Sequence, residues 1–81
     1  MDVKKDNSKI KIELNSDESI VLLEFITRFT DSVLGDGFYE SKAEELILFE
    51  LEGKLEKQID SLFSPNYKLI LENARKMIID R

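Results

Sequence analysis

Residues 20–34 read IVLLEFITRFTDSVL, and this stretch decides the fold because its apolar positions recur with the period of an α-helix. The main stripe follows the spacing i, i+3, i+4, i+7 and i+11, and consists of Leu22, Phe25, Ile26, Phe29 and Val33. Ile20, Val21 and Leu23 widen that apolar face. A helix this apolar is expected to lie at the centre of the fold, with neighbours on more than one side.

Signals at both ends delimit this helix. Asn15 or Ser16 is expected to cap its first backbone N–H groups, and Asp17 and Glu18 suit the positive end of the helix dipole. Gly35 is expected to end the helix in a left-handed conformation.

The segment before the helix alternates strictly between polar and apolar residues, which indicates a β-strand. In KIKIEL, residues 9–14, the side chains of Ile10, Ile12 and Leu14 would line one face. Residues 1–8, MDVKKDNS, are polar and unpatterned, and we expect a flexible arm there.

A single strand leaves its backbone groups without hydrogen-bond partners, so the strand over residues 9–14 needs a neighbour. It could pair internally with residues 37–40, it could pair with the same strand of a second copy, or it could join the sheet of a partner. The first two arrangements are favoured about equally over the third.

A second helix is expected over residues 41–63, because Ser41 and Glu44 match a capping box and an apolar stripe follows. The stripe consists of Leu48, Leu51, Leu55, Ile59 and Leu62. Gly53 interrupts the helix at a cost of up to about 1 kcal/mol relative to alanine. It is either a weak position or a point where another backbone approaches closely.

A third helix is expected after Ser64-Pro65-Asn66, with Ser64 as the cap and proline at the first helical position. Its apolar repeat consists of Tyr67, Ile70, Leu71, Ala74, Met77 and Ile78. Glu72 and Lys76 are spaced to pair on its outer face. The sequence therefore predicts a mainly α fold, a three-helix bundle with one N-terminal strand, forming a single domain over residues 9–81 whose neighbouring helices pack roughly antiparallel.

Composition excludes several chemistries. The 81 residues contain no histidine and no cysteine, so imidazole bases, thiolate nucleophiles, disulfides and the usual zinc sites are ruled out. We predict no catalytic residue, no metal ligand and no cofactor. The sequence shows neither a secretory signal nor an apolar run of bilayer length, so we expect a cytoplasmic protein without membrane partners.

Charge suggests what kind of partner the chain would meet. The net charge is −5, and residues 17–60 hold twelve acidic residues against four basic ones. An acidic face repels phosphates, so a nucleic-acid partner is not expected. Glu52, Glu56 and Asp60 are spaced to share one helical face, which is either a solvated surface or a docking strip for a basic protein. Glu45 is grouped with this strip as a candidate partner-binding residue.

Three aromatic residues lie off the predicted core stripes: Phe38, Tyr39 and Phe49. They either cover the ends of the bundle or form an exposed apolar anchor for a protein partner. Together with the acidic strip they complete the predicted partner-binding set.

Several segments resemble a group of short uncharacterised bacterial proteins that begin with an alternating strand and a phenylalanine-containing helix. These segments are Glu45, Leu51-Glu52, Leu55-Glu56-Lys57 and Phe63-Ser64-Pro65-Asn66-Tyr67. The resemblance implies the fold and no activity. In size, acidity and helix content the chain is also similar to immunity proteins that neutralise nuclease toxins, although it lacks their Tyr-Tyr-Pro segment.

The sequence therefore predicts a non-enzymatic interaction protein that binds a protein partner or a second copy of itself. The first alternative is an immunity or antitoxin-type inhibitor of a basic toxin. The second, more distant alternative is a small enzyme with a carboxylate site.

Overall fold

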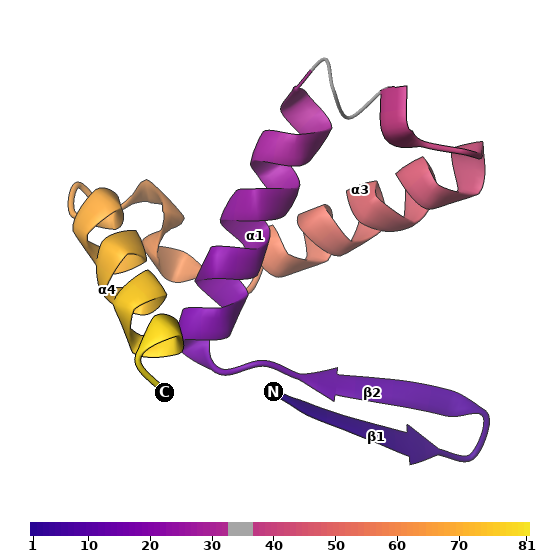
Figure 1. The fold of residues 1–81 in the computed structure, drawn as a ribbon, viewed down its shortest axis with the longest axis horizontal. Coiled ribbons are helices and arrows are strands. Elements are labelled where there is room, and N and C mark those ends of the chain that lie inside the picture. The colour runs from indigo at the N-terminus through magenta and orange to yellow at the C-terminus, as the bar shows by residue number, and fades with distance from the viewer. Residues whose placement is uncertain (33–36) are drawn as a thin grey trace.

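The computed structural model describes residues 1–32 and 37–81. The elements in chain order are β1 (Asp2–Asp6), β2 (Lys9–Glu13), α1 (Ser16–Asp31), α3 (Lys42–Glu56), the 3-10 helix η1 (Asp60–Phe63) and α4 (Tyr67–Ile79) (Figure 1). The chain is mainly helical, as predicted, and carries a two-stranded antiparallel hairpin at its N-terminus. The predicted helix end at Gly35, and the stripe position Val33, lie outside the described residues.

The hairpin corrects the prediction of an unpaired arm over residues 1–8. β1 pairs with β2 in a continuous antiparallel register from Asp2 opposite Glu13 to Asp6 opposite Lys9. The connection is the two-residue turn Asn7-Ser8, and Asn7 has a φ of 57°, in the left-handed region that tight hairpin turns require. The arm was missed because DVKKD has few apolar residues to show the alternation. Residues 37–40 do not supply the partner strand, since Gly37 and Phe38 are helical.

One face of the hairpin is apolar and exposed. Val3 lies opposite Ile12, and Lys5 lies opposite Ile10, so these four side chains share a face. Val3, Ile10 and Ile12 are each more than 60% exposed. Within the described residues, the hairpin makes at most slight contact with the helices, and Figure 1 shows it projecting from the start of α1.

The core lies between α1 and α4. Its buried apolar residues are Ile20, Leu23, Ile26, Leu71 and Ala74. The buried stripe of α1 is therefore rotated around the helix from the predicted one: Leu22 and Phe29 are only partly covered, and Phe25 is 52% exposed. α1 packs against both α4 and α3, so the burial of its residues depends on where these two helices lie.

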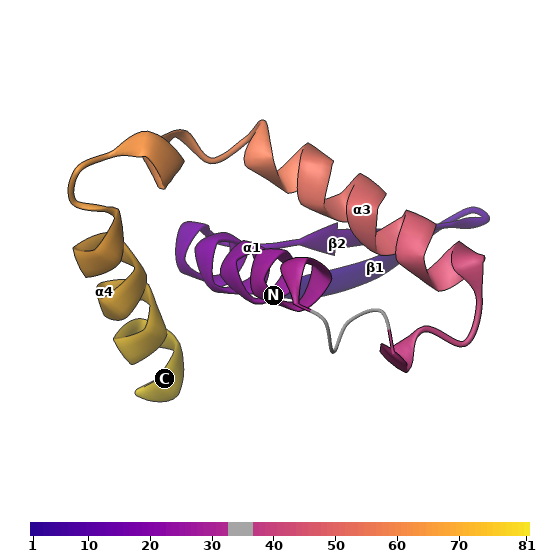
Figure 2. The same cartoon turned by 90° about the horizontal axis from the view of Figure 1, so that it is seen from above.

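α1 is the central helix, as predicted, but the helices do not close into a bundle. α4 and α3 both pack against α1, and Figures 1 and 2 show them on different sides of it. The C-terminal half of α3 approaches α1, while its N-terminal half projects away. One link between these two helices is the hydrogen bond that Thr30 Oγ1 donates to a Glu52 carboxylate oxygen at 2.8 Å.

α3 departs from its prediction in length and in burial. It ends at Glu56 instead of continuing to residue 63, and η1 follows after a short turn. No residue of α3 is buried, so the predicted buried stripe through Leu48, Leu51 and Leu55 is wrong. An added Cβ at Gly53 would meet no atom within 4 Å, which shows that no close backbone approach requires this glycine.

The turn before α4 also differs in detail. Ser64 Oγ accepts a hydrogen bond from the Asn66 N–H at 3.1 Å, and the helix begins at Tyr67, so Pro65 precedes the helix instead of occupying its first position. On the outer face of α4, Glu72 pairs with Arg75 and not with the predicted Lys76. Met77, a predicted core position, is 63% exposed.

Candidate functional site

The predicted acidic strip is divided by the end of α3. Glu52 is half-buried and accepts the hydrogen bond from Thr30, whereas Glu56 is exposed at the last position of the helix. Asp60 lies in η1 and therefore no longer shares a helical face with the other two. Glu45 pairs with Lys42 at 3.3 Å near the start of α3. A single continuous acidic docking strip is therefore not formed.

The three candidate aromatic residues also differ from one another in exposure. Tyr39 is half-buried and packs edge-on against Phe29, with the ring centroids 5.9 Å apart. Phe38 is 68% exposed and borders a shallow apolar hollow with Phe25 and Phe29. Phe49 is 44% exposed on α3. Only Phe38 and Phe49 therefore offer exposed apolar surface.

Apolar side chains are exposed on most sides of α3, and sequence reasoning missed this surface. We call it the α3 face; it consists of Leu46, Ile47, Phe49 and Leu51. Leu46 and Ile47 are 55% and 66% exposed. Leu48 and Leu55 on the same helix are partly covered. Large apolar side chains gathered in the open on one element are typical of a surface that a partner covers, so the α3 face has the composition of an interface.

Two carboxylates lie near a hollow of about 400 Å³ between α1, the end of α3 and η1. Leu23 and Leu62 contribute apolar walls, and Glu24 and Glu56 contribute the acidic groups. The Tyr67 hydroxyl donates a hydrogen bond to a Glu24 carboxylate oxygen at 2.9 Å. Burial, and then this hydrogen bond, raise the pKa of Tyr67 to about 12, so its phenol stays protonated at neutral pH.

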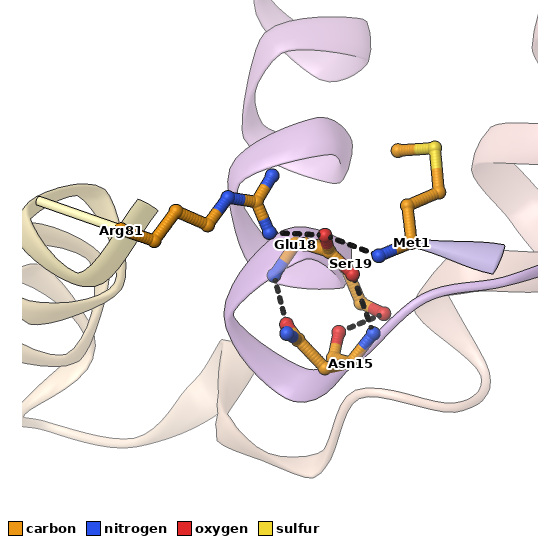
Figure 3. Close-up of polar contacts among 5 residues, drawn as sticks. All are labelled: Met1, Asn15, Glu18, Ser19 and Arg81. Atoms are coloured by element: carbon orange, nitrogen blue, oxygen red, sulfur yellow. Dashed lines mark hydrogen bonds and ion pairs between the residues drawn. The ribbon is translucent and has the colours of Figure 1, made fainter. Parts of the chain in front are cut away.

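Glu18 forms the most highly connected polar site among the described residues (Figure 3). Its side chain is 3% exposed, and one carboxylate oxygen accepts from the Met1 ammonium at 2.9 Å and from the Arg81 guanidinium at 2.6 Å. The other oxygen accepts from the Asn15 N–H at 2.9 Å. The Arg81 hydrogen bond, followed by those from Asn15 and Met1, lowers the pKa of Glu18 to about 2.

These contacts link the start of α1 to Met1 and to Arg81, and they are typical of a structural site. Each donor neutralises or hydrogen-bonds an ionised carboxylate, which makes it a poor proton acceptor or donor near neutral pH. The sequence identified Glu18 as an acid suited to the start of α1. Two of its partners, Met1 and Arg81, could not be read from the sequence, because they approach Glu18 only in the folded chain.

In the described part of the chain, no group of three or more acidic side chains is placed to hold a metal ion. None of the described helices combines the length and apolar character needed to cross a bilayer.

Comparison of the chain with protein-family models, with curated proteins and with solved structures found no match. The resemblance to short bacterial proteins therefore stays a prediction.

Proposed function

We propose that this chain is a non-enzymatic protein–protein interaction module that binds its partner through the α3 face. The observation that carries the proposal is the exposure of Leu46, Ile47, Phe49 and Leu51 on a helix with no buried residue. Four large apolar side chains held in water raise the free energy of the isolated chain, and a partner that covers them removes that cost.

The charges beside the α3 face indicate the partner's chemistry. Glu50 and Lys54 lie on the same side of α3 and pair with each other at 2.8 Å. Glu44 and Glu56 add exposed negative charge near the two ends of the helix. A surface on which apolar residues are interspersed with mainly acidic ones fits a partner whose apolar patch also carries basic residues. A basic toxin would satisfy this description, which keeps the immunity-type inhibitor as one outcome of the test.

The test is affinity capture from a lysate of the source cells with the wild-type chain and a Leu46→Ser, Ile47→Ser variant. The matched control is Leu69→Ser, Ile79→Ser on α4, since both of those residues, like Leu46 and Ile47, are more than half exposed. We expect a protein captured by the wild type and by the control to be lost with the α3 variant. Equal capture by all three would overturn the proposal.

The identity and activity of the captured protein then distinguish an inhibitor from an adaptor. A strongly basic enzyme whose activity the chain inhibits in a purified assay would identify an inhibitor. A partner whose activity is unchanged on binding would identify an adaptor or assembly protein.

A further inference from the structure

The chain exposes more surface than a self-sufficient monomer of its size. A folded monomer of 9.4 kDa is expected to expose about 5,000 Å². The observed accessible surface is 6,579 Å², which is larger by about 1,600 Å². The radius of gyration is 14.2 Å, against about 12 Å for a compact domain of this length. A standard interface covers about 800 Å² on each partner, so the excess is large enough for a stable dimer.

The hairpin contributes to this excess, and it is also the element least able to stand alone. An isolated two-stranded hairpin is marginally stable in water, and further strands or a covering helix are needed to stabilise it. In the described residues the helices provide hardly any cover. The hairpin therefore needs an additional strand more than any other element does.

The register shows which backbone groups could accept that strand. In a hairpin closed by a two-residue turn, the pair beside the turn exchanges both hydrogen bonds, and such pairs then alternate along the ladder. Asp6 and Lys9 are that first pair. The alternation directs the N–H and C=O groups of Ile10 and Ile12 away from β1, along the outer edge of β2.

We propose that β2 pairs antiparallel with β2 of a second copy, so that two hairpins form one four-stranded sheet in a symmetric dimer. The sequence KIKIE is self-complementary when the twofold axis passes through Lys11. Ile10 then lies opposite the partner's Ile12, and the two exchange backbone hydrogen bonds. Lys9 lies opposite the partner's Glu13, which places opposite charges directly across the new ladder.

On the twofold axis, Lys11 lies opposite Lys11 of the second copy, and the two positive charges repel each other. An ion pair within each hairpin reduces this repulsion. Lys11 Nζ lies 3.1 Å from an Asp6 carboxylate oxygen within the same chain.

The outer edge of β1 is less suited to pairing with β1 of a second copy, with the twofold axis through its central residue, Lys4. That arrangement would place Asp2 opposite the partner's Asp6 and Val3 opposite the partner's Lys5.

This dimer uses the hairpin edge and leaves the α3 face for a different partner, so it extends the proposed function without depending on it. The two can fail separately. Serine substitutions at Leu46 and Ile47 should leave the dimer intact, and variants of β2 should leave α3 unchanged.

The first test is sedimentation at micromolar concentration of the wild type, Ile12→Pro and Val3→Pro. Proline removes an N–H and is tolerated where that N–H faces outwards on an edge strand. Val3 and Ile12 are opposite each other in the hairpin, so the two prolines make matched changes on its two edges. We expect twice the chain mass for the wild type and for Val3→Pro, and the mass of one chain for Ile12→Pro. Circular dichroism should show unchanged helix content.

The second test exchanges charges without introducing proline. Glu13→Lys and Lys9→Glu each place like charges opposite each other in the dimer, and each should raise the dissociation constant by about tenfold. An equimolar mixture of the two variants restores both opposite-charge pairs and should form a mixed dimer with near-wild-type affinity. A monomeric wild type, an Ile12→Pro variant that still dimerises, or a mixture no tighter than the separate variants would overturn the proposal.

Discussion

Glu18 is the residue on which the folded chain concentrates its polar contacts. It completes a reciprocal cap with Asn15, whose side chain accepts from the Glu18 N–H at 2.8 Å, and it also binds Met1 and Arg81. A nearly buried carboxylate stays ionised only when hydrogen-bond donors or positive charges replace the water that it has lost. Glu18 therefore connects the start of α1 to both ends of the described chain while it remains charged.

Acid should weaken this connection. Because the folded-state pKa of Glu18 is depressed from 4.5 to about 2, its stabilising contribution is complete above about 4.5 and is lost as the pH falls towards 2. We expect the melting temperature to fall across this range more steeply in the wild type than in Glu18→Gln. Thermal melts followed by circular dichroism between pH 7 and pH 2 measure the difference.

The control for this prediction is Asp31→Asn, which removes an exposed carboxylate from the same helix. Its melting temperature should follow the wild-type pH dependence. If Glu18→Gln also followed that dependence, the ion pairs of Glu18 would not be the source of the acid sensitivity.

At the scale of the elements, α1 and α3 begin with residues of similar capping ability but differ in how they use them. The Asn15 side chain caps α1 and Glu18 returns a bond to the Asn15 N–H. Ser41 precedes α3 without a side-chain cap, and Glu44 accepts instead from the Glu40 N–H at 2.9 Å. The capping-box pattern is present at both helices, but only α1 forms the box.

Removing the two caps should therefore have unequal effects. Asn15→Ala should lower the free energy of unfolding by about 1 kcal/mol, whereas Ser41→Ala should change it by only a few tenths. Urea unfolding of both variants, followed by far-ultraviolet circular dichroism, measures this. Equal losses would mean that the Ser41 hydroxyl caps α3 in solution.

Gly53 provides a test of the openness of α3. Because an added Cβ meets nothing within 4 Å, Gly53→Ala should raise the free energy of unfolding by about 0.5–1 kcal/mol through helix propensity alone. Urea unfolding again gives the value. A destabilised variant would show that another backbone does approach α3 at this point.

At the scale of the whole molecule, the open arrangement leaves the fold with a small core, and the proposed dimer would add to its stability. Among the residues that the structure describes, the buried apolar core comprises five, and many other large apolar side chains face solvent. A chain of this size with so small a core and no disulfide commonly relies on oligomerisation. Self-association through β2 would therefore contribute to the stability of the fold.

Mass action makes this dependence measurable. If the dimer is the stable form, the melting temperature should rise with protein concentration, because dimer formation favours the folded state more strongly at higher concentration. Differential scanning calorimetry over a wide range of concentrations provides the measurement. Ile12→Pro serves as the control and should melt at a temperature independent of concentration. A wild type whose melting temperature is also constant would contradict this expectation.

The sequence by itself determined the local features of this protein: the helical periods, the cap at Asn15, the central position of α1 and a strand that begins at residue 9. These follow from contacts within a few residues, where spacing and side-chain type are sufficient. The tertiary structure alone decided which side of α1 meets α4, that residues 1–8 contribute a strand, and that α3 ends at Glu56 with its apolar residues exposed. It also decided that Glu18 meets Arg81. These features depend on segments distant in sequence, and an apolar pattern shows that a face should be covered without showing what covers it.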